Sequence, residues 1–123
     1  MIDRDAALRS ADSLVRRGRL DAAIDEYVRL VKDQPQDWNT VNVLGDLYAR
    51  TGDAENAIAQ FTRIGDFLTA EGFFSKATAV YRKALKVRPD DQGTLLRLAD
   101  LSTTQKLFAD AKQYLQQIGR AHV

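Results

Sequence analysis

Four aspartates at regular positions are the most prominent ionisable groups of this 123-residue chain. Asp12 and Asp46 lie 34 residues apart, as do Asp66 and Asp100, and the middle two are separated by 20 residues. Each directly follows a small residue, in the order Ala11, Gly45, Gly65 and Ala99. Carboxylates repeated at one helical position could pair with basic groups.

Arginines lie about one helical turn from these aspartates. Arg9, Arg63 and Arg97 stand three residues before Asp12, Asp66 and Asp100, and Arg16 and Arg50 stand four residues after Asp12 and Asp46. Two interpretations stay open. The charges form intrahelical ion pairs, each contributing a few tenths of a kcal/mol, or they make a surface of alternating charge that selects a partner carrying basic residues.

Groups suited to catalysis or metal binding are scarce. The chain has no cysteine, which excludes disulfides and thiolate chemistry. His122 is the only histidine, so neither a His-based triad nor a zinc cluster can form within one chain. Asp90 and Asp91 are adjacent, but directly after Pro89 they are typical of a helix start. We expect no enzyme activity, no metal and no cofactor.

The elements that carry these residues are expected to be helices. Apolar periodicity and turn signals predict about seven of them, over residues 3–17, 20–33, a run following Asp37, 53–71, 75–87, 91–104 and 108–118. Asp37, Asp53 and Ser75 are candidate first residues or N-caps. Gly119 follows the last helix, and Lys106 replaces the glycine expected at the last turn.

Small and large residues alternate in a way that predicts the core. The small ones, which let helix backbones approach, are Ala23, Gly45, Ala57, Gly65, Ala77 and Ala111, and the large ones that fill the gaps are Tyr27, Tyr48, Phe61, Tyr81 and Leu115. Phe74 is expected to be buried and Phe73 to be exposed. Tyr114 lies off the predicted stripe of the last helix. We therefore expect Phe73 and Tyr114 to be interface residues.

One pattern of turn and stripe residues recurs. It is spelled Gly18, Leu20, Ala23, Tyr27, Leu30 and Pro35, then Gly52, Ala54, Ala57, Phe61 and Ile64, then Gly72, Phe74, Ala77, Tyr81, Ala84 and Pro89. The pattern resembles the tetratricopeptide repeat, a 34-residue helical hairpin. The resemblance implies an all-α solenoid of antiparallel helices forming one domain over residues 1–123. Its repeats would cover approximately residues 4–37, 38–71, 58–91 and 92–123.

The repeats predicted over 38–71 and 58–91 overlap because the middle aspartate spacing is 14 residues short. Fourteen residues are close to four helical turns, at about 3.6 residues per turn. A helix can therefore be lost while its apolar stripe stays nearly in phase. We expect one long helix, over 53–71, to be shared between repeats two and three.

The resemblance also implies a function in binding proteins. In this family the aspartate position faces a concave groove, which makes the partner-binding candidates Asp12, Arg16, Asn39, Asn42, Asp46, Arg50, Arg97 and Asp100. Chaperone-binding members grip a carboxylate there with lysine and asparagine. Here Asp46 and Asp100 would repel it, so we expect no affinity for acidic EEVD-type tails. The alternative is a structural unit that assembles with itself as a dimer or larger, for example by exchange of a helix between copies.

Charge and hydropathy restrict the other partners. The 18 basic and 17 acidic residues leave a formal charge of +1, which favours neither nucleic acid nor a membrane surface. The charged first residues lack the apolar core of a secretory signal, and no run is long enough to span a membrane. We expect a cytoplasmic protein that resembles the bacterial multi-repeat members of the family; it is either the front of a longer repeat protein or a chain whose last helix is covered by another copy.

Overall fold

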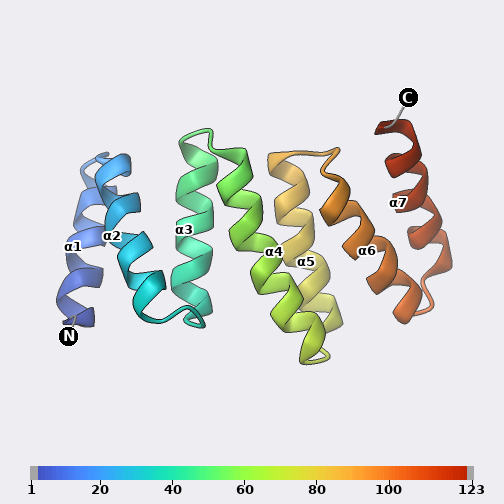
Figure 1. Ribbon diagram of the computed structural model, residues 1–123, viewed down its shortest axis with the longest axis horizontal. Coiled ribbons are helices and arrows are strands. Elements are labelled where there is room, and N and C mark those ends of the chain that lie inside the picture. The colour runs from blue at the N-terminus through green and yellow to red at the C-terminus, as the bar shows by residue number, and fades with distance from the viewer. Residues whose placement is uncertain (1–2, 122–123) are drawn as a thin grey trace. The chain divides into compact units, whose positions relative to one another are not determined.

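The computed structural model describes residues 3–121, which form helices joined by short turns (Figure 1). The helices of this part are α1 (Arg4–Arg16), α2 (Leu20–Asp33), α3 (Trp38–Arg50), α4 (Ala54–Ala70), α5 (Phe74–Val87), α6 (Gln92–Thr104) and α7 (Phe108–Ala121). No strand occurs between residues 3 and 121. The predicted all-α class and the number of helices are confirmed. His122 lies outside the described residues.

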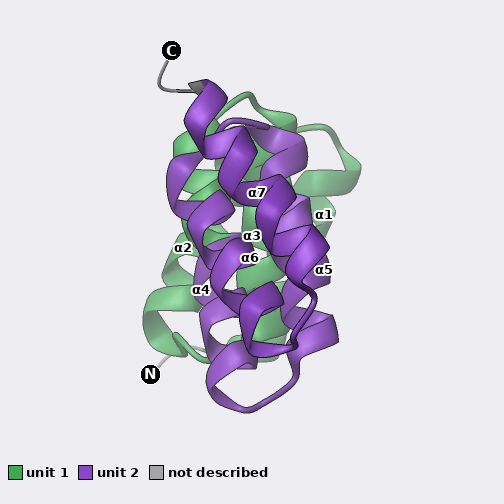
Figure 2. Ribbon diagram, turned by 90° about the vertical axis from the view of Figure 1, so that its right-hand side faces the viewer, with its two compact units in different colours: residues 1–60 green, residues 61–123 purple. Residues whose placement is uncertain are grey.

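The helices group into two compact units, residues 1–60 (unit 1) and residues 61–123 (unit 2), coloured separately in Figure 2. In unit 1, α2 packs against both α1 and α3, around a core containing Ala11, Tyr27, Leu30, Leu44 and Leu47. In unit 2, α6 packs against α5 and α7, around a core containing Tyr81, Leu95, Leu98, Leu101 and Tyr114. The division between the units falls inside α4.

Four helix-to-helix turns share one backbone geometry. Gly18, Gly52 and Gly72 have φ angles of 74°, 82° and 82°, in the left-handed region that glycine adopts without steric cost. The residue after each glycine donates its N–H to a carbonyl five residues back, for example Phe73 to Leu68 at 2.8 Å. Lys106 takes the same place with φ 61°, and Leu107 donates to Ser102 at 2.8 Å. The hairpin without a glycine therefore keeps the common turn.

The other two turns contain proline and end in an aspartate cap. Asp37 accepts a hydrogen bond from the N–H of Thr40 at 3.5 Å, and Asp91 accepts one from the N–H of Thr94 at 3.0 Å. Asp37 is thereby confirmed as an N-cap. The two turns lie 54 positions apart, as do Gly18 and Gly72. Units 1 and 2 thus repeat the same order of turns.

Helix α4 is flanked by a glycine turn on each side. It begins after Asp53, whose side chain accepts from the N–H of Asn56 at 3.2 Å, and ends before Gly72. At 17 residues it is longer than the other described helices. Elsewhere each helix that has two neighbours is bounded by one proline turn and by one left-handed turn, formed by a glycine or by Lys106. This order of turns supports our proposal that α4 serves two repeats, with repeats at 4–37, 38–71, 58–91 and 92–123.

Three details of the predicted helices are wrong. Helix α5 begins at Phe74 and its N-cap is Phe73, not Ser75, because the turn at Gly72 already sets where the chain re-enters a helix. Helix α7 continues through Gly119 to Ala121, since Gly119 lacks the positive φ of the turn glycines. Leu115 is 54% exposed instead of filling the core.

We predict that Lys106→Gly stabilises the chain by about 1 kcal/mol. A left-handed conformation costs a non-glycine residue about 1–2 kcal/mol, and glycine removes this strain while adding some freedom to the unfolded chain. Urea unfolding followed by circular dichroism measures the change. In the matched control, Gly52→Ala introduces the same strain at the equivalent turn and should destabilise. A lower stability of Lys106→Gly would contradict the prediction.

Candidate functional site

A hollow of about 360 Å³ opens between α4, α5 and α6 of unit 2. We call it the unit 2 hollow. At ~30 Å³ per water, it has room for about a dozen waters. Its lining is Asp66, Thr69, Ala70, Tyr81, Arg97, Asp100, Leu101 and Thr104. Two of the predicted partner-binding residues, Arg97 and Asp100, are among them.

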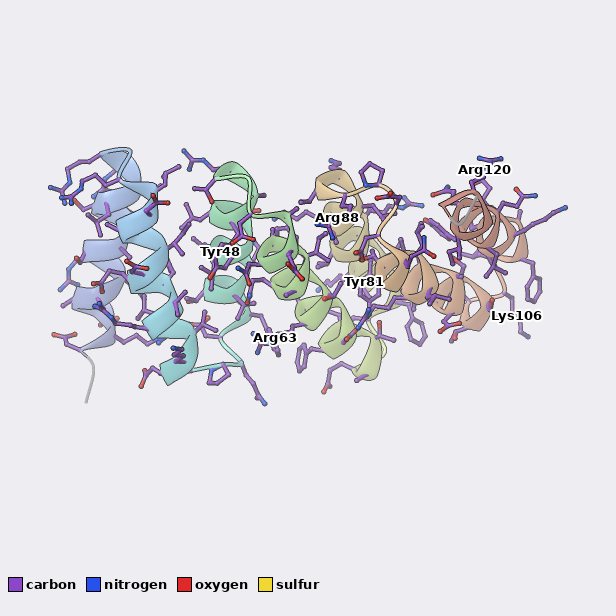
Figure 3. The ribbon with its side chains drawn as sticks, turned by 45° about the horizontal axis from the view of Figure 1, so that its top comes forward. Tyr48, Arg63, Tyr81, Arg88, Lys106 and Arg120 are labelled. Atoms are coloured by element: carbon purple, nitrogen blue, oxygen red, sulfur yellow. The ribbon has the colours of Figure 1, made fainter. Side chains whose placement is uncertain are left out.

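The floor of this hollow depends on a close contact between α4 and α5. The Tyr81 ring lies so near Gly65 that a Cβ added at Gly65 would overlap it. Tyr81 is 2% exposed, and Figure 3 shows it on α5. Because Gly65 precedes Asp66 directly, the same contact brings the Tyr81 hydroxyl to the Asp66 carboxylate. The small residue at this position therefore has a structural role that the sequence predicted.

Asp66 is held from two sides. The hydroxyl of Tyr81 donates to Oδ1 of Asp66 at 2.6 Å. From α6, Arg97 donates through Nε to Oδ1 at 2.8 Å and through Nη2 to Oδ2 at 3.3 Å. One of the two interpretations above pairs Arg97 with Asp100 on its own helix, but Arg97 instead pairs with Asp66. Its Nη1 donates back to the carbonyl of Gly93 at 3.2 Å, so the side chain extends toward the start of α6 and away from Asp100.

These contacts raise the pKa of Tyr81 and that of Arg97. Burial, together with the hydrogen bond to Asp66, raises the pKa of Tyr81 to about 12. The hydrogen bond to Asp66 also raises the pKa of Arg97. At neutral pH the phenol is therefore a fixed donor and the guanidinium a fixed cation, and Asp66 is their shared acceptor.

The carboxylate of Asp100 differs from that of Asp66. Asp100 is exposed at the edge of the unit 2 hollow, and no hydrogen bond or ion pair to its carboxylate occurs among residues 3–121. Only its backbone carbonyl is used, by the Thr104 hydroxyl at 3.0 Å. The hollow therefore has one negative charge that the protein itself does not match.

Unit 1 uses the equivalent residues differently. Asp12, 54 positions before Asp66, forms an ion pair with Arg16 at 2.6 Å. This intrahelical pair agrees with one of the two open interpretations, and because both side chains are well exposed it contributes little stability. A separate hollow of about 300 Å³ is lined by Leu8, Tyr27, Asp37, Asn39, Thr40 and Val43. It contains the predicted Asn39.

Asp37, which lines that unit 1 hollow, already forms an ion pair with Arg4. Arg4 donates to Asp37 at 2.6 Å and to the carbonyl of Leu30 at 3.1 Å, joining α1 to the end of α2 and the start of α3. The hydrogen bond from Arg4 holds the pKa of Asp37 below its usual value. We interpret this cluster as structural, since the same carboxylate caps α3.

The remaining predicted residues are spread over other parts of the chain. Asn42 and Asp46 are half-buried on α3, and Arg50 is exposed at its end. Phe73 is 51% exposed, as predicted, with the Lys76 ammonium 5.3 Å from its ring centroid. Tyr114 is only 9% exposed and belongs to the core of unit 2, so the prediction of an exposed interface residue is wrong. Its ring turns inward because α7 buries the side facing α6.

The site also contains residues that the prediction missed. Thr69, Ala70, Tyr81 and Thr104 were not named as binding residues, although all four line the unit 2 hollow. The signal was present in the 54-residue spacing, which aligns Ala70 with Arg16 and Thr104 with Arg50. Two arginines in unit 1 thus correspond to two short side chains around the hollow of unit 2.

Among residues 3–121, no group of three or more acidic or histidine side chains is placed to hold a metal ion. No helix in this part of the chain is long and apolar enough to cross a membrane.

Two family models together match nearly the whole chain. A family model described as a tetratricopeptide repeat matches residues 8–67, and another with the same description matches residues 68–123. Among solved structures, a mutant of the protein MamA is similar, with a TM-score of 0.53, 20% identity and coverage of 98% of each chain. The MamA RS-1 ArsTM double mutant has a TM-score of 0.51 at 12% identity, covering 98% of this chain and 75% of its own. At such identities the likeness concerns the fold alone. A search of curated proteins found no significant match.

We predict that the chain loses stability as pH rises from about 10 to about 12, in part through Tyr81. In the unfolded chain this phenol ionises near 10.0, whereas in the folded chain it keeps its proton until about 12. The folded state then binds more protons, so the free energy of unfolding falls with rising pH. Urea unfolding at a series of alkaline pH values measures the slope. Tyr81→Phe should flatten it, and an unchanged slope in that variant would contradict the assignment.

Proposed function

Because the chain belongs to the tetratricopeptide repeat family, we propose that it is a protein-interaction module that binds an extended segment of a partner in the unit 2 hollow. The hollow is the single observation that carries this proposal. It lies between α4 and α6, which we propose to be the first helices of repeats three and four. The resemblance to the family implies that first helices face the concave, partner-binding side.

The lining of the hollow suits a peptide. Exposed Ala70 and the edge of the buried Leu101 supply the apolar part of the lining, while charged and hydroxyl groups surround them. Binding sites commonly combine an apolar surface with a few placed polar groups. The described lining contains no nucleophile paired with a base. We therefore assign binding and no catalysis to the site, and we propose no cofactor.

The chemistry of the groove also restricts the partner. Asp46 and Asp100 occupy the positions at which chaperone-binding family members hold a carboxylate. An aspartate repels such a group, whereas asparagine would donate to it. The proposed partner segment is therefore not an acidic C-terminal tail.

We predict that Ala70→Trp blocks partner binding without unfolding the chain. Ala70 is exposed at the last position of α4, so an indole there fills the hollow from its edge. A displayed library of random short peptides is selected on the wild-type chain, and the peptides obtained are then tested on the variant. We expect most of them to lose binding. Glu71→Trp, exposed one position further along the chain, is the control and should keep it.

The selection separates the possible results. Peptides that bind both variants equally would place the binding surface elsewhere, and failure to select any peptide would contradict a peptide-binding module. Circular dichroism of each variant shows whether α4 remains folded.

A second candidate function is self-association through α7. Phe108 and Leu115 are 64% and 54% exposed and lie seven residues apart, on one face of this helix. Leu115 is 54 positions after Phe61, which is only 1% exposed. A residue that is covered in α4 is thus uncovered at its equivalent place in α7. We propose that a second copy covers this face. Exchange of α4 between two chains is an alternative form of self-association that we also propose. A contribution of Phe73 to the interface between copies is likewise a proposal.

We predict that association strengthens with concentration and weakens in the double variant Phe108→Ser, Leu115→Gln. Both substitutions remove apolar surface that a second copy would bury, at about 25 cal/mol per Å². Light scattering on a sizing column, from micromolar to hundreds of micromolar chain, measures the mass. A monomer throughout this range, with a mass of 13.8 kDa, would rule out self-association.

A further inference from the structure

We infer that the unit 2 hollow accepts a cationic N–H donor group, namely the end of a lysine or arginine side chain, which pairs with Asp100. The inference rests on the proposed function and specifies what the partner segment must carry. Three features support it: the directions of the hydroxyl protons, the balance of charge and the comparison with unit 1.

The hydroxyl groups around the hollow donate away from it. The Tyr81 hydroxyl donates to Asp66 at 2.6 Å, that of Thr69 to the carbonyl of Gly65 at 2.9 Å, and that of Thr104 to the carbonyl of Asp100 at 3.0 Å. A hydroxyl has one proton and two lone pairs. With their protons used in this way, the more accessible hydroxyls of Thr69 and Thr104 have lone pairs and no proton to offer a ligand. A ligand that brings only acceptors would leave them unmatched.

The balance of charge in the lining also favours a cationic ligand. Arg97 is the one cation of the lining, and its charge is matched by Asp66 at 2.8 Å. Asp100 has no such partner within the described part of the chain. The lining therefore has one uncompensated negative charge, and a cationic group is the ligand that complements it.

Unit 1 shows which group binds one aspartate of the repeated series. Arg16 stands four residues after Asp12 and binds it at 2.6 Å. The equivalent of Arg16 in unit 2 is Ala70, and the residue four after Asp100 is Thr104, where unit 1 has Arg50. In unit 1 the chain supplies a cation to Asp12 from the same helix. Around the unit 2 hollow, short side chains stand at the places of Arg16 and Arg50, which leaves space beside Asp100 for a cation from outside.

The test titrates the chain with capped alanine peptides whose central residue is lysine, arginine, Nε-acetyllysine or glutamate. Amide chemical shifts of Leu101 and Thr104, recorded by NMR, report binding at the hollow. We expect saturable shifts with lysine or arginine and none with acetyllysine or glutamate. The two cationic peptides distinguish an ammonium from a guanidinium ligand. Added salt should weaken both.

Two substitutions test the role of Asp100. Asp100→Asn removes the unmatched charge and should raise the Kd of the cationic peptide about fivefold, which is the scale of an exposed charge pair. Thr104→Arg should weaken it similarly, because an arginine four residues after Asp100 can pair with it as Arg16 pairs with Asp12. Asp90→Asn, on the exposed turn before α6, changes the net charge equally and should leave binding unchanged.

The outcomes are separable from those of the proposed function. No saturable shift with either cationic peptide, an equal response to acetyllysine, or unchanged binding in Asp100→Asn would each overturn the inference. If the display selection gives peptides that require the open hollow but lack basic residues, the inference fails while the proposed function stands. If no selected peptide depends on the hollow, the proposed function fails.

Discussion

The contact between the Tyr81 ring and the backbone at Gly65 sets the arrangement of the candidate site. Only a residue without a side chain lets α5 approach α4 so closely. The approach fixes the phenol against Asp66, and Asp66 in turn holds Arg97 from α6. Because these three groups satisfy one another, Asp100 is left as the carboxylate available to a partner. A packing constraint in the core thus determines which charge is exposed at the surface.

The sequence predicts the helices better than their contacts. Turn glycines and the cap at Asp37 act locally, so their effect can be read from neighbouring residues. The partner of Arg97 could not be read in this way, because the choice between Asp100 and Asp66 depends on a neighbouring helix. The exchange of roles between Tyr114 and Leu115 has a similar origin. Both lie near the apolar stripe of α7, and which of them is buried depends on how α7 turns toward α6.

Two units built on the same order of turns differ in what they present to solvent. Tyr27 and Tyr81 are equivalent and both buried, and burial raises the pKa of each. The differences lie in exposed positions, where a change of side chain costs little stability. Arginine at position 16 and alanine at position 70 leave the packing alone and alter the charge available to a ligand. A repeated scaffold can therefore acquire a binding site in one copy only.

The continuity of α4 affects how the chain folds. Its first residues belong to unit 1 and its last ten to unit 2, within one run of helical hydrogen bonds. Nucleating a helix is unfavourable and extending it is not, so once either unit has ordered its part of α4, the other part can be added by extension. Order in one unit thus lowers the barrier to ordering the other, as between neighbours in a one-dimensional array. Cooperativity between the two units is in this way encoded in the backbone of a single helix.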